Sequence, residues 1–372
     1  MSNPTVVVSA LAIQAGVPML WWGPPGTGKS STMGAMGLAL GRHTEVIISS
    51  IREPSDFGGL PAIIDKAVHM VPPRWAIRLN EAATAGIPGV AFFDEINTAA
   101  PAVQAGLLRV ILDRVVGDLA LPPIVSMAAA ANAVEQAAGG WDLAAPLANR
   151  FWHGQWQMDN QAWVHGILGG FPAPEVPRLR AEWDVTVPTS NALVGSFINH
   201  RPTLLLQVPN SASDAGKAWP SPRSWTMAAR LLAASSAAGY SNESDVAMTA
   251  VAGCVGPGPA TEILAWIKEM DLPDPEAILK APEKFSLPKR SDRQFAVLAS
   301  VAAAVVQNVT VERYLAGWKV MAIAAKDGPK DVAAAAAGSL MLLHRRKQDL
   351  PVPTAELKAF LPLLKAAGMV AA

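Results

Sequence analysis

Short apolar runs alternate with longer amphipathic segments along the first 158 residues of the chain. The apolar runs have the length and composition of buried strands, and they cover residues 18–22, 44–49, 89–93, 124–131 and 152–157. Segments with a helical pattern lie between them, for example Pro101–Val115. This alternation predicts an α/β fold, in which a parallel sheet carries helices on both faces. A ligand of such a sheet is expected beyond the carboxyl ends of its strands.

The pattern changes after the second predicted strand. Two short apolar runs, Ala62–Ile64 and Val68–Met70, flank the polar residues Asp65 and Lys66, with prolines on both sides. This arrangement predicts a small β-hairpin, inserted into the core at about residues 55–75. Residues 160–210 are rich in proline and irregular, with one short helix expected near Asn191–His200.

The chain becomes almost wholly helical after Pro222. Asp274, Pro275 and Glu276 form a helix start signal, with an N-cap aspartate and a proline in the first turn. Further helices are predicted at Gln294–Gln307, Val311–Ala325, Asp331–His344 and Glu356–Ala367, the last of them shortened or kinked by Pro362. The predicted organisation is therefore an α/β core over 1–158, a helical region over 159–270 and a further helical region over 271–372.

Composition narrows the possible functions. The chain has 372 residues, 30 Lys plus Arg and 30 Asp plus Glu, so its formal net charge is zero. It lacks the excess of positive charge expected of a protein that binds nucleic acid or an anionic membrane. The single cysteine, Cys254, excludes an intrachain disulfide and agrees with a cytoplasmic location. The apolar stretch 6–22 is interrupted by Gln14, Gly16 and Pro18, and no Lys or Arg precedes it. A helix and then a strand are expected there, rather than a signal peptide or a membrane span.

A complete phosphate-binding motif, G-x-x-x-x-G-K-[ST], follows the first predicted strand. Its residues and the next one are the expected nucleotide contacts: Gly23, Pro24, Pro25, Gly26, Thr27, Gly28, Lys29, Ser30 and Ser31. Glycines let backbone amides curl around phosphate oxygens, and the N-terminus of the following helix adds partial positive charge. Lys29 is expected to reach the β- and γ-phosphates of ATP, and Ser30 is expected to bind Mg²⁺.

Polar residues follow two other predicted strands. Asp94 and Glu95 end the run Val90–Phe93; beside a phosphate-binding loop, Asp94 is expected to hold Mg²⁺ and Glu95 to deprotonate the attacking water. Asn132 follows another apolar strand, where an amide could contact the attacking water or the γ-phosphate or simply turn the chain.

Two arginines are candidates because of their positions relative to these motifs. Arg150 lies just before the last predicted strand, and Arg223 opens the first long helix of the second half. Isolated arginines are usually surface residues, but an arginine supplied by a neighbouring subunit accelerates phosphoryl transfer by several orders of magnitude.

In this order the motifs resemble those of the AAA+ ATPases and, within them, of the MoxR-like family, over about residues 15–235. The family's D-E-I-N, P-x-x-Q-x-x-L-L, S/T-D-L-x-G, D-R-F and S-P-R motifs are similar to the segments at 94–97, 101–108, 55–59, 149–151 and 221–223. Two positions depart from the family pattern: Asn149 stands in place of the usual aspartate, and no proline follows Asn132.

The resemblance implies an ATP-hydrolysing remodelling or chaperone-type protein with a helical lid after its core. Asn132 would be the sensor 1 residue, Arg150 the arginine finger acting on a neighbouring subunit, and Arg223 the sensor 2 residue. It also implies a ring-shaped homo-oligomer, commonly a hexamer, and a protein client or a partner with a von Willebrand factor A domain.

Two alternatives stay open at this point. A nucleic-acid motor or restriction-type NTPase subunit could carry the same nucleotide motifs, but neutral charge and the absence of a basic, aromatic-interleaved stripe argue against it. A nucleotide switch that barely hydrolyses ATP is disfavoured because both Asp94 and Glu95 are present.

Overall fold

The computed structural model describes residues 3–132, 141–269, 272–328, 330–347 and 349–360. These residues form two compact units. The first comprises Met1–Arg178, Leu206–Met227 and Ala252–Gly256, and the second comprises Leu179–Leu205, Ala228–Val251 and Pro257–Ala372. The sequence predicted three consecutive domains, divided at 158 and 270. The two units interleave along the chain, so their bounds cannot be compared one by one with that division, which stays a prediction.

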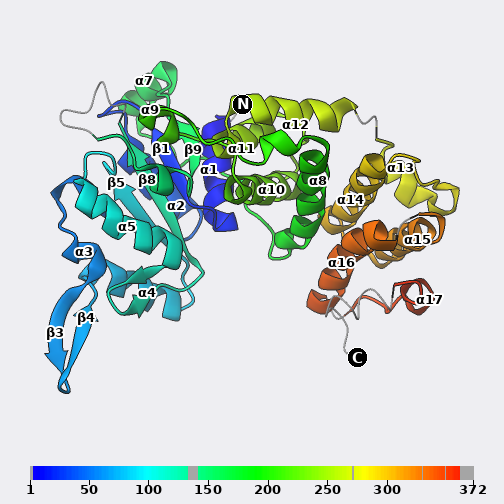
Figure 1. Ribbon diagram of the computed structural model, residues 1–372, viewed down its shortest axis with the longest axis horizontal. Coiled ribbons are helices and arrows are strands. Elements are labelled where there is room, and N and C mark those ends of the chain that lie inside the picture. The colour runs from blue at the N-terminus through cyan, green and yellow to red at the C-terminus, as the bar shows by residue number, and fades with distance from the viewer. Residues whose placement is uncertain (1–2, 133–140, 270–271, 329, 348, 361–372) are drawn as a thin grey trace. The chain divides into compact units, whose positions relative to one another are not determined.

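The first unit is built on a parallel sheet (Figure 1). Among the described residues this sheet has five strands, in the order β2 (His43–Ile48), β5 (Gly89–Asp94), β8 (Val125–Ala131), β1 (Met19–Trp22) and β9 (Trp152–Gln155). All five predicted strands are confirmed. Strand β9 ends two residues earlier than predicted, because its partner β1 ends at Trp22, where the phosphate-binding loop begins.

Helices cover both faces of the sheet, as predicted. The first unit contains α1 (Pro4–Ala15), α2 (Lys29–Ala39), α3 (Ser55–Gly58), α4 (Arg74–Thr84), α5 (Pro101–Asp113), α6 (Ala145–Ala148), α7 (Asn160–Gly169) and α9 (Ala212–Ala215). Helix α2 lies against β2 at Thr44, whose side chain fills the space beside Gly37. Helix α4 meets the next residue, Glu45, through Arg78. Because successive side chains of a strand point to opposite faces, α2 and α4 cover opposite faces of the sheet.

Apolar side chains from both layers fill the core of this unit. Phe57, Trp75 and Phe93 pack edge to face or tilted, with ring centroids 5.8–6.4 Å apart. The β8 residues from Val125 to Ala131 are all buried, as expected for a central strand of a parallel sheet. A buried, rigid sheet fixes the positions of the residues that follow its strands.

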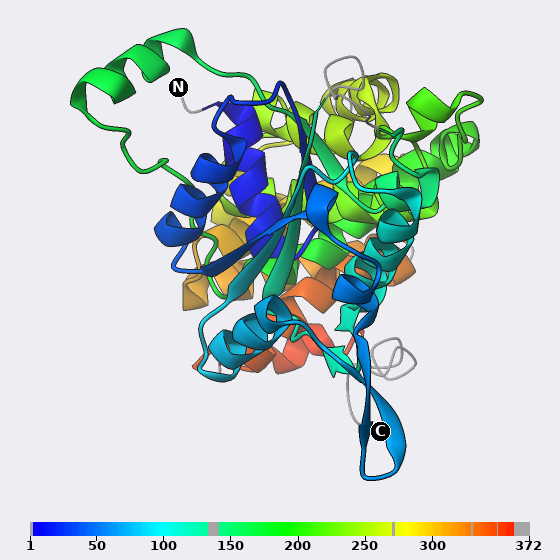
Figure 2. The same ribbon diagram turned by 90° about the vertical axis from the view of Figure 1, so that its left-hand side faces the viewer.

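The predicted hairpin is confirmed as β3 (Leu60–Ile64) and β4 (Ala67–Val71), which pair antiparallel. Its two turn residues, Asp65 and Lys66, have φ values of 50° and 64°. Positive φ at both central residues is the requirement of a type I′ hairpin turn. Figure 2 shows the hairpin projecting from the body of the first unit. A second, two-residue pair of strands is formed by β6 (Val115–Val116) and β7 (Leu119–Ala120).

Helix α7 was not predicted, and the expectation of an irregular chain from residue 160 is wrong at this point. Asp159 caps the helix by accepting hydrogen bonds from the backbone amides of Gln161 and Ala162. Gly166 and Gly169 lower the helical propensity of the segment, so the sequence pattern did not predict a helix there. The large apolar side chains of α7 are exposed, so its sequence lacks the one-sided burial pattern of a core helix.

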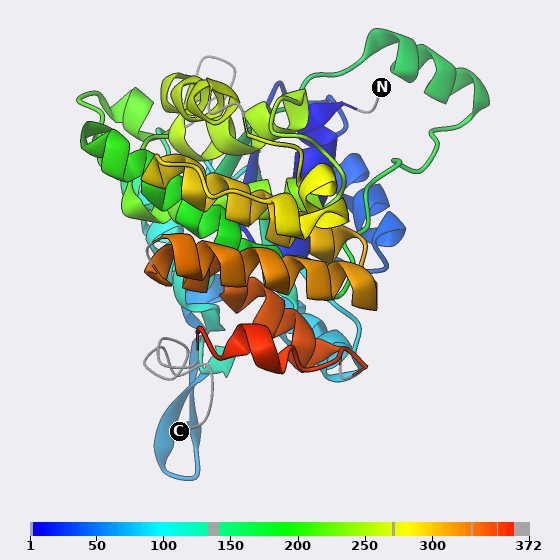
Figure 3. The ribbon, with the colours of Figure 1, turned by 90° about the vertical axis from the view of Figure 1, so that its right-hand side faces the viewer.

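The second unit is helical (Figure 3). It contains η3 (Trp183–Thr186), α8 (Val187–His200), η4 (Pro202–Leu204), α12 (Pro257–Glu269), α13 (Pro275–Lys280), η5 (Pro282–Lys284), α14 (Ser291–Gln307), α15 (Val311–Asp327), α16 (Lys330–Arg346) and α17 (Thr354–Leu357). Helices α10 (Pro222–Ala237) and α11 (Asp245–Val255) run through residues assigned to both units. Helix α8 begins four residues before the predicted start, with Pro188 in its first turn.

The predicted helices after residue 270 are present as α13 to α16. Of the last predicted helix, the described part contains α17, and residues from 361 onward, Pro362 included, lie outside the described residues. The core of this unit gathers around the fully buried side chains of Tyr314, Trp318 and Phe360. No helix in the described part of the chain is both long and apolar enough to cross a membrane.

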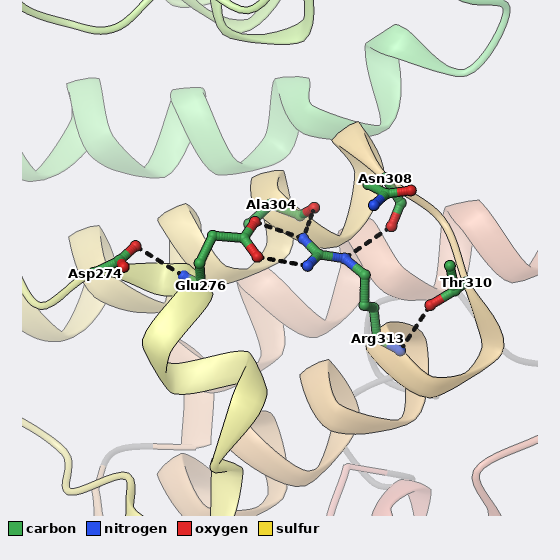
Figure 4. A network of polar contacts seen from close by, with 6 residues as sticks. All are labelled: Asp274, Glu276, Ala304, Asn308, Thr310 and Arg313. Atoms are coloured by element: carbon green, nitrogen blue, oxygen red, sulfur yellow. Dashed lines mark hydrogen bonds and ion pairs between the residues drawn. The ribbon is translucent and has the colours of Figure 1, made fainter.

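A charged network fastens α13 to α15 (Figure 4). The Arg313 guanidinium donates to both carboxylate oxygens of Glu276, at 2.6 and 2.7 Å, and to the backbone carbonyls of Ala304 and Asn308. The predicted cap of α13 is confirmed, because Asp274 accepts from the Glu276 amide at 3.0 Å. The pKa of Glu276 is lowered by its hydrogen bonds from Arg313.

Candidate active site

The phosphate-binding loop joins β1 to α2 in the strand–loop–helix arrangement predicted for it. Gly26 and Gly28 have φ values of 74° and 83°, in the left-handed region that glycine adopts without strain. Gly28 is also the N-cap of α2, so the loop runs directly into the N-terminus of an eleven-residue helix. Unpaired amides and partial positive charge at that end favour an anion.

Lys29 lies buried inside the loop. Its Nζ donates to the carbonyl oxygens of Gly23 and Pro24, both at 2.8 Å, and to Asn132 Oδ1 at 2.9 Å. Burial lowers the pKa of Lys29, and the nearby charges of Asp94 and Glu95 act in the opposite direction. The ammonium group is thus held by neutral oxygens at the inner end of the loop.

The two acids lie where β5 ends. Asp94 Oδ2 accepts a hydrogen bond from Ser30 Oγ, and its Oδ1 accepts from the Glu95 amide at 2.9 Å. Glu95 has a φ of 55°, a conformation that only a small fraction of non-glycine residues adopt. The adjacent hydroxyl and carboxylate of Ser30 and Asp94 are hard oxygen donors of the kind that Mg²⁺ prefers. These two residues therefore fit the magnesium site predicted from the sequence.

Two residues with no predicted role position Glu95 and Asn132 through hydrogen bonds. Ser50, in η1 (Ser49–Ile51), donates to Glu95 Oε2 at 2.5 Å. Asn97 is fully buried; its Nδ2 donates to the Asn132 carbonyl at 2.8 Å, and its Oδ1 accepts from the Asn132 amide at 3.1 Å. Asn97 belongs to the D-E-I-N segment, whereas only the pairing of β2 with β5 brings Ser50 to Glu95.

Asn132 follows β8, which lies between β1 and β5 in the sheet. This strand order puts the Asn132 amide between the phosphate-binding loop and the acidic pair. Most of the predicted loop and strand-end residues line one cavity of about 350 Å³: Pro25, Gly26, Thr27, Gly28, Lys29, Ser30, Ser31, Asp94, Glu95 and Asn132. Gly23 and Pro24 do not line it, and their carbonyls bind Lys29 instead.

The two candidate arginines do not line that cavity. Arg150 follows α6, and its guanidinium donates to the Pro146 carbonyl, while Arg223 is exposed in the first turn of α10. The pKa of Arg150 is lowered by burial and, second, by the positive charge of Arg223. The two arginines therefore lie near one another, apart from the residues that surround Lys29.

Asn149, which stands where the resembling family has an aspartate, makes two hydrogen bonds that use both ends of its amide. Its Nδ2 donates to the Trp219 carbonyl at 3.2 Å, and its Oδ1 accepts from Ser221 Oγ at 2.7 Å. An aspartate could accept the second hydrogen bond but could not donate the first. The amide thus ties the segment that carries Arg150 to the segment that carries Arg223.

Comparisons with known proteins add little to this picture. No protein-family model matches the chain, and no curated protein matches it. Among solved structures, one from Cytophaga hutchinsonii, a protein proposed to be an ATPase, has a TM-score of 0.36 and 15% sequence identity. The match covers 76% of this chain and 88% of that one. A likeness at this level supports no conclusion about activity.

Proposed function

We propose that this chain binds ATP with Mg²⁺ and hydrolyses it. The observation that carries the proposal is the meeting of Lys29, Ser30, Asp94, Glu95 and Asn132 around one cavity beyond the carboxyl ends of three parallel strands. Each of these residue types supplies a distinct part of phosphoryl transfer: a cation, two metal ligands, a base and a polar amide.

The residues would divide the work as follows. Loop amides and Lys29 bind the phosphates, and Lys29 exchanges at least one of its neutral oxygen partners for a phosphate oxygen. Ser30 and Asp94 hold Mg²⁺, which neutralises charge on the β- and γ-phosphates when bound. Glu95 takes a proton from the attacking water, and Ser50 orients the Glu95 carboxylate.

We further propose that the protein is an AAA+ remodelling ATPase of the MoxR-like kind, working as a ring. Arg150 would complete the site of a neighbouring subunit, and Arg223 would act on its own subunit's nucleotide. Neither arginine lines the cavity of its own chain, so the two assignments rest on the family resemblance. A protein client or a partner with a von Willebrand factor A domain follows from the family resemblance.

A nucleic-acid motor is the alternative. The balanced charge of the chain disfavours it, because such proteins carry a basic surface that binds phosphates. Pull-down with the Glu95→Gln variant, loaded with ATP, distinguishes the two: recovery of a protein supports remodelling, and recovery of nucleic acid supports the motor.

The activity is tested by comparing Glu95→Gln with the wild-type protein. The variant keeps the phosphate-binding loop and Asp94, so it is expected to bind ATP with little change. Its hydrolysis rate is expected to fall by about a hundredfold or more, since general-base catalysis contributes roughly 10²–10⁴-fold. Ser241→Ala, an exposed serine outside the site, is the control. Unchanged hydrolysis by Glu95→Gln would remove Glu95 from the proposed role.

The assembly is tested by mixing two inactive variants. Lys29→Ala lacks nucleotide binding but retains Arg150, whereas Arg150→Ala binds nucleotide but lacks the arginine. If Arg150 acts on a neighbour, mixed assemblies regain part of the activity. Arg223→Ala mixed with Lys29→Ala is expected to show no comparable gain. Mixed assemblies with confirmed subunit exchange and no recovered activity would contradict the arrangement.

A further inference from the structure

Trp156, the first residue after β9, contacts the phosphate-binding loop from outside. Its backbone amide donates to the Trp22 carbonyl at 2.7 Å, which extends the pairing of β9 with β1 by one residue. Its ring packs on Trp21 with centroids 4.7 Å apart. Its indole Nε1 donates to the carbonyl oxygen of Thr27 at 3.1 Å. A single side chain thus bridges the strand before the loop and the loop itself.

The contact with Thr27 meets a specific need of an anion-binding loop. When backbone amides turn toward an anion, the carbonyls of the same peptides turn away from it and require donors of their own. Lys29 donates hydrogen bonds to the carbonyls of Gly23 and Pro24, and the hydroxyl of Thr27 also donates to the Pro24 carbonyl. Trp156 donates a hydrogen bond to the carbonyl of Thr27, two residues before Lys29.

The two kinds of donor respond differently to a ligand. Lys29 is the expected partner of the phosphates, so its bonds to the loop carbonyls weaken when ATP binds. The indole N–H of Trp156 has no role toward the phosphates, and its bond to Thr27 is free to persist in both states. Trp156 is therefore the contact that can hold the loop in shape while Lys29 changes partners.

The close approach of Trp156 to Gly23 supports the same conclusion. A Cβ atom at Gly23 would lie 2.8 Å from the Trp156 carbonyl oxygen and 3.0 Å from its Cβ. On its other side, the Gly23 amide donates to the Ala131 carbonyl at 3.2 Å. The first residue of the loop is thus packed between Trp156 and the end of β8, which fixes where the loop starts.

We propose that Trp156 is a positioning residue that holds the loop 23–30 in its phosphate-binding shape through the indole bond to Thr27. This proposal rests on the proposed binding of ATP. It implies that Trp156 governs affinity for the phosphates rather than the chemical step, because Asp94 and Glu95 lie at the end of a different strand, β5.

The test replaces Trp156 by phenylalanine, which keeps an aromatic ring on Trp21 and removes the N–H donor together with the smaller ring of the indole. Loss of one hydrogen bond is expected to weaken ATP binding about five- to tenfold. The dissociation constant is measured in the Glu95→Gln background, where hydrolysis does not interfere, and KM and kcat are measured in the otherwise wild-type chain. KM is expected to rise by the same factor while kcat stays within about twofold.

A matched control separates this effect from general packing. Trp163→Phe makes the same replacement on the exposed face of α7, seven residues further along the chain, and is expected to leave KM unchanged. If Trp156→Phe lowers the unfolding temperature without ATP but leaves ATP affinity unchanged, Trp156 is a packing residue only and the proposal is wrong. If the Glu95→Gln chain with Trp156 intact does not bind ATP, the proposed function and this inference both fail.

Discussion

Lys29 and Arg313 are both cations held by three or more hydrogen bonds, yet their partners differ in charge. Arg313 meets a carboxylate, with two hydrogen bonds to Glu276 at 2.6 and 2.7 Å. Lys29 meets two carbonyls and an amide oxygen, and within the described ranges no carboxylate oxygen lies within 4.0 Å of its Nζ. The charge of Arg313 is neutralised by the fold, whereas that of Lys29 is available to an anion.

The pKa directions follow the same division. Hydrogen bonding to Glu276 raises the pKa of Arg313, while burial lowers the pKa of Lys29. A buried cation without an anionic partner is costly to the fold unless hydrogen bonds offset its lost hydration. The comparison indicates that the Lys29 site is kept for a ligand and that the Arg313 site is structural. Three changes test this division and one tests a buried histidine, from the largest expected effect to the smallest.

Lys29→Ala is expected to have the largest effect. The variant loses charge-assisted contacts to two phosphate groups, each worth about 1.5–3 kcal/mol. ATP affinity therefore falls about a thousandfold or more. The free energy of unfolding without ATP is expected to change by only about 1–2 kcal/mol, because removing a desolvated charge offsets part of the cost of leaving three oxygens without this donor. Nucleotide titration and chemical unfolding measure the two quantities, and Lys268→Ala, an exposed lysine, is the control. A large loss of stability with ATP affinity retained would make Lys29 structural.

Asn132→Asp converts the Lys29 site into one that resembles the Arg313 site. A carboxylate 2.9 Å from Nζ would pair with Lys29 and repel the phosphates. ATP affinity is expected to fall about a hundredfold, while the stability of the chain without ATP rises or stays unchanged. Asn132→Ala removes the acceptor without adding charge and is expected to weaken binding less. Equal losses for the two variants would show that charge at this position is not what matters.

His153 is a third case, a buried titratable group that meets only neutral partners and stays uncharged. Its Nδ1 accepts from Trp22 Nε1 at 2.8 Å, so Nε2 carries the proton and donates to the Ala148 carbonyl at 2.9 Å. Burial lowers the pKa of His153 from 6.5 to about 4. Below pH 6.5 the unfolded chain binds a proton here that the folded chain does not, so stability falls as the pH drops from about 6.5 to 4.

At pH 5 this histidine is expected to reduce the free energy of unfolding by about 2 kcal/mol relative to pH 7.5. Urea unfolding at the two pH values measures it, and His153→Gln, which does not titrate, should remove that part of the pH dependence. An identical pH dependence in the two chains would mean that His153 has the same pKa in the folded and the unfolded chain, which would contradict the effect of burial.

The residues that surround Lys29 were predictable because their positions follow from simple rules. Gly23, Asp94 and Asn132 each come directly after an apolar run, and parallel strands bring their carboxyl ends to one edge. Ser50 and Trp156 were not predictable, because only strand pairing brings them to Glu95 and to the loop. Pattern reasoning finds residues that the chain presents at strand ends, but it misses those that support them from neighbouring strands.

In the helical unit, too, the sequence predicts local structure but not contacts between residues far apart along the chain. The N-cap Asp274 and the helices around it followed from local signals, and they are present. The bidentate pair between Glu276 and Arg313 joins residues 37 positions apart and depends on how α13 packs on α15. Nothing in the sequence distinguishes these two charged residues from others on exposed helical surfaces.

Arg313→Met is expected to have the smallest effect, and only on stability. The variant leaves the carbonyls of Ala304 and Asn308 without this donor, and it leaves Glu276 unpaired. Because the Glu276 side chain is 45% exposed, water can hydrate its carboxylate, so the expected cost is only about 1–2 kcal/mol. Chemical unfolding measures this cost, and Arg313→Lys, which keeps the charge but not the two-point contact, should recover part of it. ATP affinity is expected to stay within twofold of the wild-type value, since the Arg313 charge is already neutralised by the fold. If Arg313→Met instead weakened ATP binding as Lys29→Ala does, the division between a structural and a ligand-binding cation would be wrong.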